Sequence, residues 1–362
     1  MTERSRNQEL RALLVILVAC AAAQLQARPL PAGAPAGYHL QRELPMAEVT
    51  GWDELAIDAA ARRLFISNNS GLVVFDIDTL QRVGTVPQPP NFKGVGLVHG
   101  VAIAAVLGRG FISHELPPSV YAFDLKSLAP LGVTPTDSGT DAIVYDPASQ
   151  RVFTFNSKHR GVHDATAVDA VSGRLLAAIP LPGSPESAVA DGSGKLYVNI
   201  ESLSALVEID ARLLKVTRQW PLSPCKGPGG LAMDIAHRRL FAACDNQIMV
   251  MIDAESGKVL AQQPTGDGTD AVSFDPGTGL AFASNGAGTL TVLHEDSPYK
   301  LSLVQNVTTA PGARTMALDP MTHRVFLVAG QFGAAGARPT ADNPHGYPTA
   351  RPGSVRLLVF GP

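Results

Sequence analysis

The chain is 362 residues long, with 45% hydrophobic and 17% charged residues, 34 Gly, 28 Pro and a formal net charge of −3. This length and apolar content allow a large hydrophobic core and exclude an intrinsically disordered chain. The acidic balance disfavours a nucleic-acid-binding protein, which needs a basic face, and two Trp are too few for a carbohydrate-binding groove.

Residues 1–27 have the features of an export signal. Three Arg residues precede the apolar run 12–23, which is too short to span a bilayer as a helix. Two routes of processing fit this segment. Cleavage near Ala27 gives a soluble protein, whereas lipidation of Cys20, which ends a sequence like a bacterial lipobox, gives a lipid anchor. We therefore expect one mature domain, residues 28–362, that is periplasmic or secreted and has no transmembrane span.

From residue 55 onward, one pattern recurs every 41 to 46 residues. A short apolar strand ends in Asp, a turn follows, and the next strand begins with a basic, an aliphatic and an aromatic residue, as in 231–234 and 239–241. Six copies have the turn Asp, and the seventh has Ala104 in its place. A period of this length with short strands is typical of a β-propeller that has one four-stranded blade per repeat.

We predict an all-β, seven-bladed β-propeller. The third strand of the last repeat is expected at 355–360, close to the end of the sequence, so the outer strand of that blade must come from elsewhere. Segment 38–46 is the only strand-like segment left unassigned. We expect it to complete the seventh blade and close the ring, which removes the exposed sheet edges. An open solenoid built from the same repeats is the alternative.

Particular strands and turns carry a resemblance to a known family. They are the basic-aliphatic-aromatic strands, the strand 196–199 (Leu-Tyr-Val-Asn) and the exits of two third strands at 168–174 and 252–258. Through them, the sequence from 38 to 360 resembles the YncE-like, YVTN-repeat family of exported bacterial seven-bladed propellers. The resemblance implies the fold but no single function, because such propellers serve as binding platforms and, in some relatives, as enzymes.

Cys225 and Cys244 are the two cysteines outside the export signal. Cys225 lies in the loop that leads into the fifth blade, and Cys244 ends the second strand of that blade. Because neighbouring strands run antiparallel, both positions fall at the same end of the blade. We predict a disulfide, which persists in exported proteins, over the alternative of two buried thiols.

Many acidic residues are expected to stabilise turns rather than perform chemistry. An Asp at the end of a strand accepts hydrogen bonds from the backbone N–H groups of the following turn. Eleven Asp residues occupy such positions of the repeat: Asp58, Asp76, Asp124, Asp146, Asp169, Asp191, Asp210, Asp234, Asp253, Asp275 and Asp319.

One face of a propeller is built by the loops that lead into each blade and by those between its second and third strands, and ligands usually bind there. The first set of loops is expected to contribute Trp52, Asp53, Glu54, His99, Asp141, Glu186, Asp270 and Arg314. The second set is expected to contribute His114, Glu115, Asn156, Asn199, Glu201 and Asn285. These side chains suit a polar ligand or a cation, and the alternative is simply the polar wall of a water-filled channel.

No motif requires a cofactor. The sequence lacks the Gly-x-Ser-x-Gly, P-loop and His-Glu-x-x-His motifs, so a divalent cation in the channel is the one cofactor that the residues suggest. His114 and Glu115 are the best candidates for its ligands, since they belong to the same blade as His99.

The favoured function is an exported binding or scaffold protein whose funnel face takes a small molecule, a peptide or a protein. The alternative is a metal-assisted, lactonase-like hydrolase in which a carboxylate, an Asn and a His hold the ion that activates water. Binding of single-stranded nucleic acid is disfavoured by the acidic balance and the few aromatic residues. A monomer is expected.

The segment 331–353 interrupts the last repeat between its second and third strands and is rich in Ala, Gly and Pro. Loops at this point lie on the funnel face, so we expect the insertion to overhang the channel. It would act either as a lid, with Asp342, His345 and Tyr347 facing a ligand, or as a solvated flap.

Overall fold

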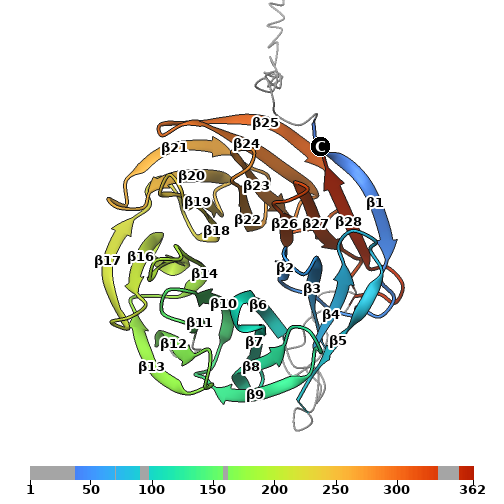
Figure 1. Ribbon diagram of the computed structural model, residues 1–362. Helices are drawn as coiled ribbons and strands as arrows, with labels where there is room; N and C mark the ends of the chain where they lie inside the picture. The colour runs from blue at the N-terminus through green and yellow to red at the C-terminus, as the bar shows by residue number, and fades with distance from the viewer. Residues whose placement is uncertain (1–36, 70, 90–97, 158–161, 333–349) are drawn as a thin grey trace, which may run out of the picture.

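The computed structural model describes residues 37–69, 71–89, 98–157, 162–332 and 350–362, which form a ring of seven four-stranded antiparallel sheets (Figure 1). Each sheet is one blade, and its first strand lies next to the central channel. The described residues contain only two short 3₁₀ helices, η1 (Ala105–Leu107) and η2 (Glu201–Leu203). The predicted seven-bladed propeller is therefore confirmed.

The blades follow the chain in order. Blade one consists of β2 (Leu55–Asp58), β3 (Arg63–Asn68), β4 (Gly71–Asp76) and β5 (Arg82–Pro87). Blade two consists of β6 (Val98–Ala104), β7 (Arg109–Glu115), β8 (Pro118–Asp124) and β9 (Pro130–Pro135). Blade three consists of β10 (Thr140–Asp146), β11 (Arg151–Ser157), β12 (His163–Asp169) and β13 (Leu175–Leu181). Blade four consists of β14 (Pro185–Ala190), β15 (Lys195–Ile200), β16 (Ala205–Asp210) and β17 (Lys215–Pro221). Blade five consists of β18 (Pro228–Asp234), β19 (Arg239–Cys244), β20 (Ile248–Asp253) and β21 (Val259–Pro264). Blade six consists of β22 (Thr269–Asp275), β23 (Leu280–Asn285), β24 (Thr289–Ser297) and β25 (Lys300–Thr308). Blade seven is β26 (Met316–Asp319), β27 (Arg324–Ala329), β28 (Arg356–Gly361) and β1 (His39–Pro45).

The N-terminal strand closes the ring as expected. β1 pairs antiparallel with β28, with Leu44 opposite Leu357, and forms the outer edge of blade seven (Figure 1). Tyr38, just before β1, donates a hydrogen bond from its hydroxyl to the carbonyl of His323 at 2.8 Å and packs edge-on against Phe282 of blade six. These contacts hold the N-terminal segment on the last strand of the chain and so close the ring, with β1 covering the edge of β28.

The aromatic residue of each repeat forms the core between blades. These residues occupy the third position of the second strand in every blade and are at most 1% exposed: Phe65, Phe111, Phe153, Tyr197, Phe241, Phe282 and Phe326. The basic residue two positions earlier often reaches the neighbouring blade. Arg109, for example, donates from Nη1 to the carbonyl of Ala170 at 2.9 Å.

The turn residues behave as the sequence predicts. Each of the eleven Asp residues accepts at least one backbone hydrogen bond at its own turn, as Asp146 does from Ser149 at 2.8 Å. The degenerate second repeat, with Ala104, instead turns through η1, which Gly108 ends in a left-handed conformation with φ 63°.

Cys225 and Cys244 form the predicted disulfide, with their Cα atoms 5.5 Å apart. Disulfides are typical of proteins that fold in an oxidising compartment. The predicted export signal, including Cys20 and Ala27, lies outside the described residues. In the described ranges, no helix has the length and hydrophobicity needed to cross a bilayer.

The two ends of the insertion 331–353 lie on the channel face. Phe332 forms an isolated bridge with Ala350, whose N–H donates to the carbonyl of Thr50 at 3.1 Å. The Phe332 ring packs against Trp52 with the ring centres 5.0 Å apart. Asp342, His345 and Tyr347, which the lid interpretation invokes, lie outside the described residues.

Candidate functional site

One position of the repeat supplies the ionisable side chains at the channel. It lies five residues before the turn residue in every repeat and is occupied, in order, by Asp53, His99, Asp141, Glu186, Gly229, Asp270 and Arg314. The six ionisable residues of this set all line one cavity at the centre of the propeller. We call these six side chains the polar ring. Aligning the repeats at a fixed offset from the turn residue brings these residues to one position of the repeat, but it does not show that their side chains face the channel.

The backbone explains why these side chains face the channel. In five blades the pairing of the first and second strands is irregular at this position, as between Val98 and Val101 in blade two. Such bulges interrupt the alternation of side chains between the two faces of a sheet and redirect a side chain. In blades one and seven the first strand begins only after it, at Leu55 and Met316.

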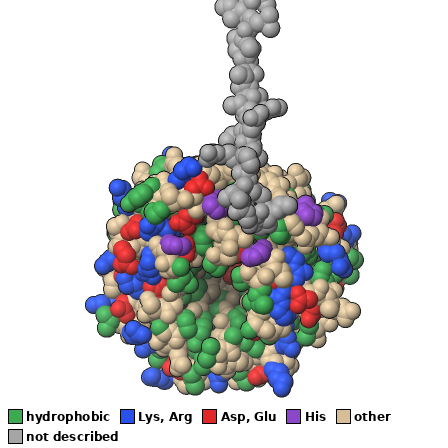
Figure 2. Space-filling view, turned by 45° about the horizontal axis from the view of Figure 1, so that its top comes forward, with side chains coloured by type: hydrophobic (Ala, Val, Ile, Leu, Met, Phe, Trp, Pro, Cys, Tyr) green, Lys and Arg blue, Asp and Glu red, His purple; other side chains and the backbone are tan. Residues whose placement is uncertain are grey.

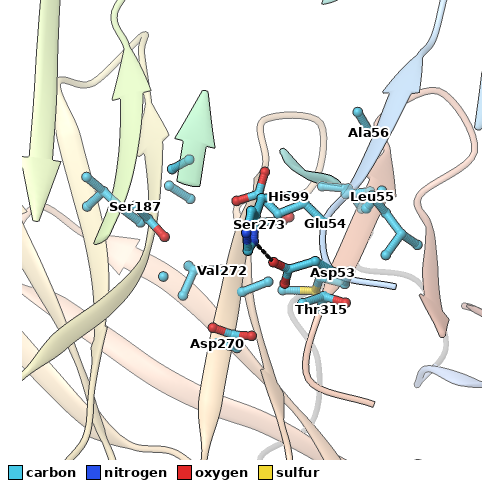
Figure 3. Close-up of a pocket in the computed structure, with 18 of the residues that line it drawn as sticks. Asp53, Glu54, Leu55, Ala56, His99, Ser187, Asp270, Val272, Ser273 and Thr315 are labelled. Atoms are coloured by element: carbon cyan, nitrogen blue, oxygen red, sulfur yellow. Dashed lines mark hydrogen bonds and ion pairs between the residues drawn. The ribbon is translucent and has the colours of Figure 1, made fainter. Parts of the chain in front are cut away.

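The cavity is large and has two chemical zones. Its volume is about 1050 Å³, which is enough for a small organic molecule. Beyond the polar ring, the wall is formed by apolar side chains of the first strands, among them Leu55, Ile143, Leu231, Val272 and Met316. Figure 2 shows the hollow at the centre of the ring with hydrophobic side chains along its wall, and Figure 3 shows Asp53, His99 and Asp270 beside it.

His99 is held between carboxylates on both sides of its ring. Its Nδ1 lies 2.6 Å from Asp53 Oδ2 and 3.3 Å from Asp141 Oδ1, and its Nε2 lies 3.3 Å from Glu115 Oε2. Burial alone would lower the pKa of His99, but the hydrogen bonds with Asp53 and Glu115 and the charge of Asp141 raise the pKa well above its ordinary value. The carboxylates around His99 therefore favour its imidazolium form.

Two carboxyl groups at the cavity, those of Glu54 and Glu186, have pKa values well above the ordinary range. Burial, reinforced by the charges of Asp53 and Asp141, raises the pKa of Glu54 to about 8, and burial next to Asp141 and Glu201 raises the pKa of Glu186 to about 9. Among the described residues, neither side chain makes an ion pair or a hydrogen bond. Asp270, by contrast, lies 3.1 Å from Nε of Arg314.

The remaining predicted site residues do not line the cavity. His114 is buried in blade two, and Glu201 is exposed in η2. The three Asn side chains are buried within or between blades and donate hydrogen bonds to Asp164 and Thr166 (from Asn156), to the carbonyl of Gly229 (from Asn199), and to Thr289 and Thr291 (from Asn285). Glu115 reaches the site only through its contact with His99.

Asp53, His99 and Asp141 are the residues that could share a metal ion. In the described part of the chain, one donor atom from each lies within 4.8 Å of the others, and His114 and Glu115 are not in this group. A metal at His99 Nδ1 would have to replace the proton that this atom shares with Asp53. The arrangement fits a protonated His–carboxylate cluster without further change.

Comparison with known proteins supports the fold. No family model matches the chain, and no curated protein matches it in sequence. Among solved structures, a chain of hydrazine synthase from Kuenenia stuttgartiensis matches with a TM-score of 0.67 and 14% identity, over 80% of this chain and 96% of that one. The WD40 repeats of RRP9 match with a TM-score of 0.70 and 9% identity, over 90% of this chain and 99% of that one. The likeness is one of fold.

Proposed function

We propose that the protein is an exported binding protein that holds a small molecule in the central cavity, with the polar ring as its recognition element. The observation that carries this proposal is the contrast between two positions of the repeat. The turn residue is Asp in six repeats, whereas the ring position varies among Asp, Glu, His, Arg and Gly. A position that only stabilised the fold would have no need of this variety, whereas an asymmetric ring suits an asymmetric ligand.

The proposed location follows from the export features of residues 1–27 and from the disulfide. Both fit a periplasmic or secreted protein, and both agree with the resemblance to the YncE-like propellers. The mass of the N-terminal peptide from the mature protein tests this part. Cleavage near Ala27 gives a soluble protein, and a lipidated Cys20 gives an anchored one.

Binding is tested by screening small organic molecules for an increase in the thermal midpoint. We expect wild type to be stabilised by at least one chemical class and the Ser187→Trp variant, which places an indole in the cavity, to lose the response. Leu213→Trp, on the exposed surface of the same blade, is the matched control and should respond like wild type. Equal stabilisation of all three proteins would show that ligands bind elsewhere and would contradict the proposal.

A metal-assisted hydrolase is the second candidate, favoured by the proximity of Asp53, His99 and Asp141. A metal there would lower the pKa of a bound water and create a nucleophile. Native mass spectrometry with one bound metal ion, together with lactone hydrolysis that His99→Gln abolishes, would favour this candidate over simple binding.

A further inference from the structure

The composition of the cavity restricts what it can bind. Five carboxyl groups line it, those of Asp53, Glu54, Asp141, Glu186 and Asp270, against one guanidinium and one imidazole. The imidazole of His99 and the guanidinium of Arg314 are already engaged by carboxylates. An anionic ligand would therefore be repelled by the carboxylates of Asp53, Asp141 and Asp270. Among the described residues that line the cavity, it would find no cation free of a carboxylate partner.

Glu186 marks the place where a positive charge is missing. Its side chain makes no ion pair or hydrogen bond in the described residues, although Asp141, Glu201, Asp270 and Asp53 all lie close enough to raise its pKa. Ionisation of a carboxyl group in such surroundings costs free energy unless a cation binds beside it. The polar ring therefore has a place for a positively charged group that no described side chain of the cavity occupies.

The rest of the cavity is unsuited to a metal ion alone. A bare ion occupies only a small part of about 1050 Å³ and makes no use of the apolar wall around Val272 and Met316. Trp52 and Phe332, packed 5.0 Å apart, add an aromatic surface to the same cavity. Aromatic faces attract alkylated ammonium groups, and apolar walls accommodate hydrocarbon.

We propose that the ligand of this cavity is an organic cation, with its ammonium group among the carboxylates of the polar ring and its hydrocarbon part along the apolar wall. The proposal rests on the proposed binding function and specifies its ligand class. Carboxylate–ammonium contacts provide orientation, and the apolar wall provides most of the buried area.

Isothermal titration calorimetry with four probes tests the inference: hexyltrimethylammonium, hexanol, hexanoate and a divalent metal (Ca²⁺ or Zn²⁺) alone. We expect hexyltrimethylammonium to bind roughly tenfold or more tightly than hexanol, because its fixed charge is attracted to the carboxylates and to the aromatic faces of the cavity, and we expect hexanoate not to bind. Glu186→Gln should weaken the ammonium probe several-fold. Glu48→Gln, which removes the same charge at an exposed position outside the cavity, should not.

Each other result overturns the inference. The inference is wrong if hexanol or hexanoate binds at least as tightly as the ammonium probe, or if the metal alone binds tightly. It is also wrong if the ammonium probe does not bind at concentrations of about 10 mM, or if both Glu variants lose the same affinity. Ser187→Trp separates the two levels of the account. If a neutral or anionic compound binds wild type but not Ser187→Trp, the binding function stands and only the ligand class is wrong.

Discussion

Arg62 of blade one donates from Nη1 and Nη2 to the two carboxylate oxygens of Asp319 in blade seven, at 2.9 and 2.7 Å. Asp319 is fully buried, and burial alone would raise its pKa, but the hydrogen bonds from Arg62 and Thr322 outweigh it and lower the pKa. The same contact recurs elsewhere in the ring, where Arg238 binds Asp191 of the preceding blade. A charged clamp therefore joins the last blade to the first, beside the pairing of β1 with β28.

Arg62→Met tests this clamp. The variant leaves a buried carboxylate without its charge partner, so we expect the free energy of unfolding to fall by about 3 kcal/mol. Chemical denaturation at pH 7 measures it. Arg82→Met, at an exposed position of β5, is the control and should change stability by less than about 0.5 kcal/mol. Equal effects of the two substitutions would show that the clamp adds nothing to ring closure.

The contribution of β1 is tested by deletion. Removal of residues 28–46 exposes the edge of β28, and we expect the thermal midpoint to fall by roughly 10 °C or more and the protein to self-associate. Removal of residues 28–36 alone leaves β1 in place and serves as the control. A synthetic peptide of residues 37–46 should restore the midpoint of the longer deletion. If the longer deletion unfolds like wild type, β1 does not hold the ring closed.

The disulfide encloses a loop with a sequence separation of 19. Replacing both Cys225 and Cys244 with Ala should lower the free energy of unfolding by about 3 kcal/mol. Denaturation with and without a reductant checks the assignment. Reductant should destabilise wild type to the level of the double variant and leave the double variant unchanged, and wild type that is insensitive to reductant would contradict the bridge.

The pH dependence of stability should report on Glu186. Burial and the charges of Asp141, Glu201, Asp270 and Asp53 raise its pKa from 4.5 to about 9. Between these values the folded protein binds more protons than the unfolded chain, so this group makes stability fall as the pH rises.

Glu186→Gln removes that titration. The variant should match wild type near pH 4 and exceed it near pH 8 by up to about 5 kcal/mol, measured by urea denaturation at both values. Glu48→Gln, at an exposed position outside the cavity, should give less than about 0.5 kcal/mol at either pH. A gain of equal size at both pH values would mean that repulsion at Glu186 is not the cause.

The fold could be predicted from the sequence because its determinants are local and repeated. The turn Asp, the basic residue and the buried aromatic residue recur at fixed spacing, and each one fixes a turn or a blade contact. Even the non-local pairing of β1 with β28 could be predicted. The last repeat lacks its outer strand, and the N-terminal segment is the only strand-like segment that belongs to no repeat.

The site was predictable only in part, because the polarity of a residue does not indicate whether its side chain points into the channel or into its own blade. Asp53, His99 and Glu186 face the cavity, whereas Asn156 and Asn285, at the ends of second strands, turn into their own blades to satisfy buried Thr and Asp side chains. The decisive feature is backbone irregularity at the ring position, which periodicity alone does not reveal. The contact of Phe332 with Trp52 joins residues 280 positions apart and has no local signal.

A crystal structure of the protein with hexyltrimethylammonium tests the central claim most directly. We expect the ammonium group to lie between Glu186 and the other carboxylates of the polar ring, with the hexyl chain along the wall near Val272 and Met316. Density for the probe only outside the central cavity, or an empty cavity at saturating probe, would contradict the account.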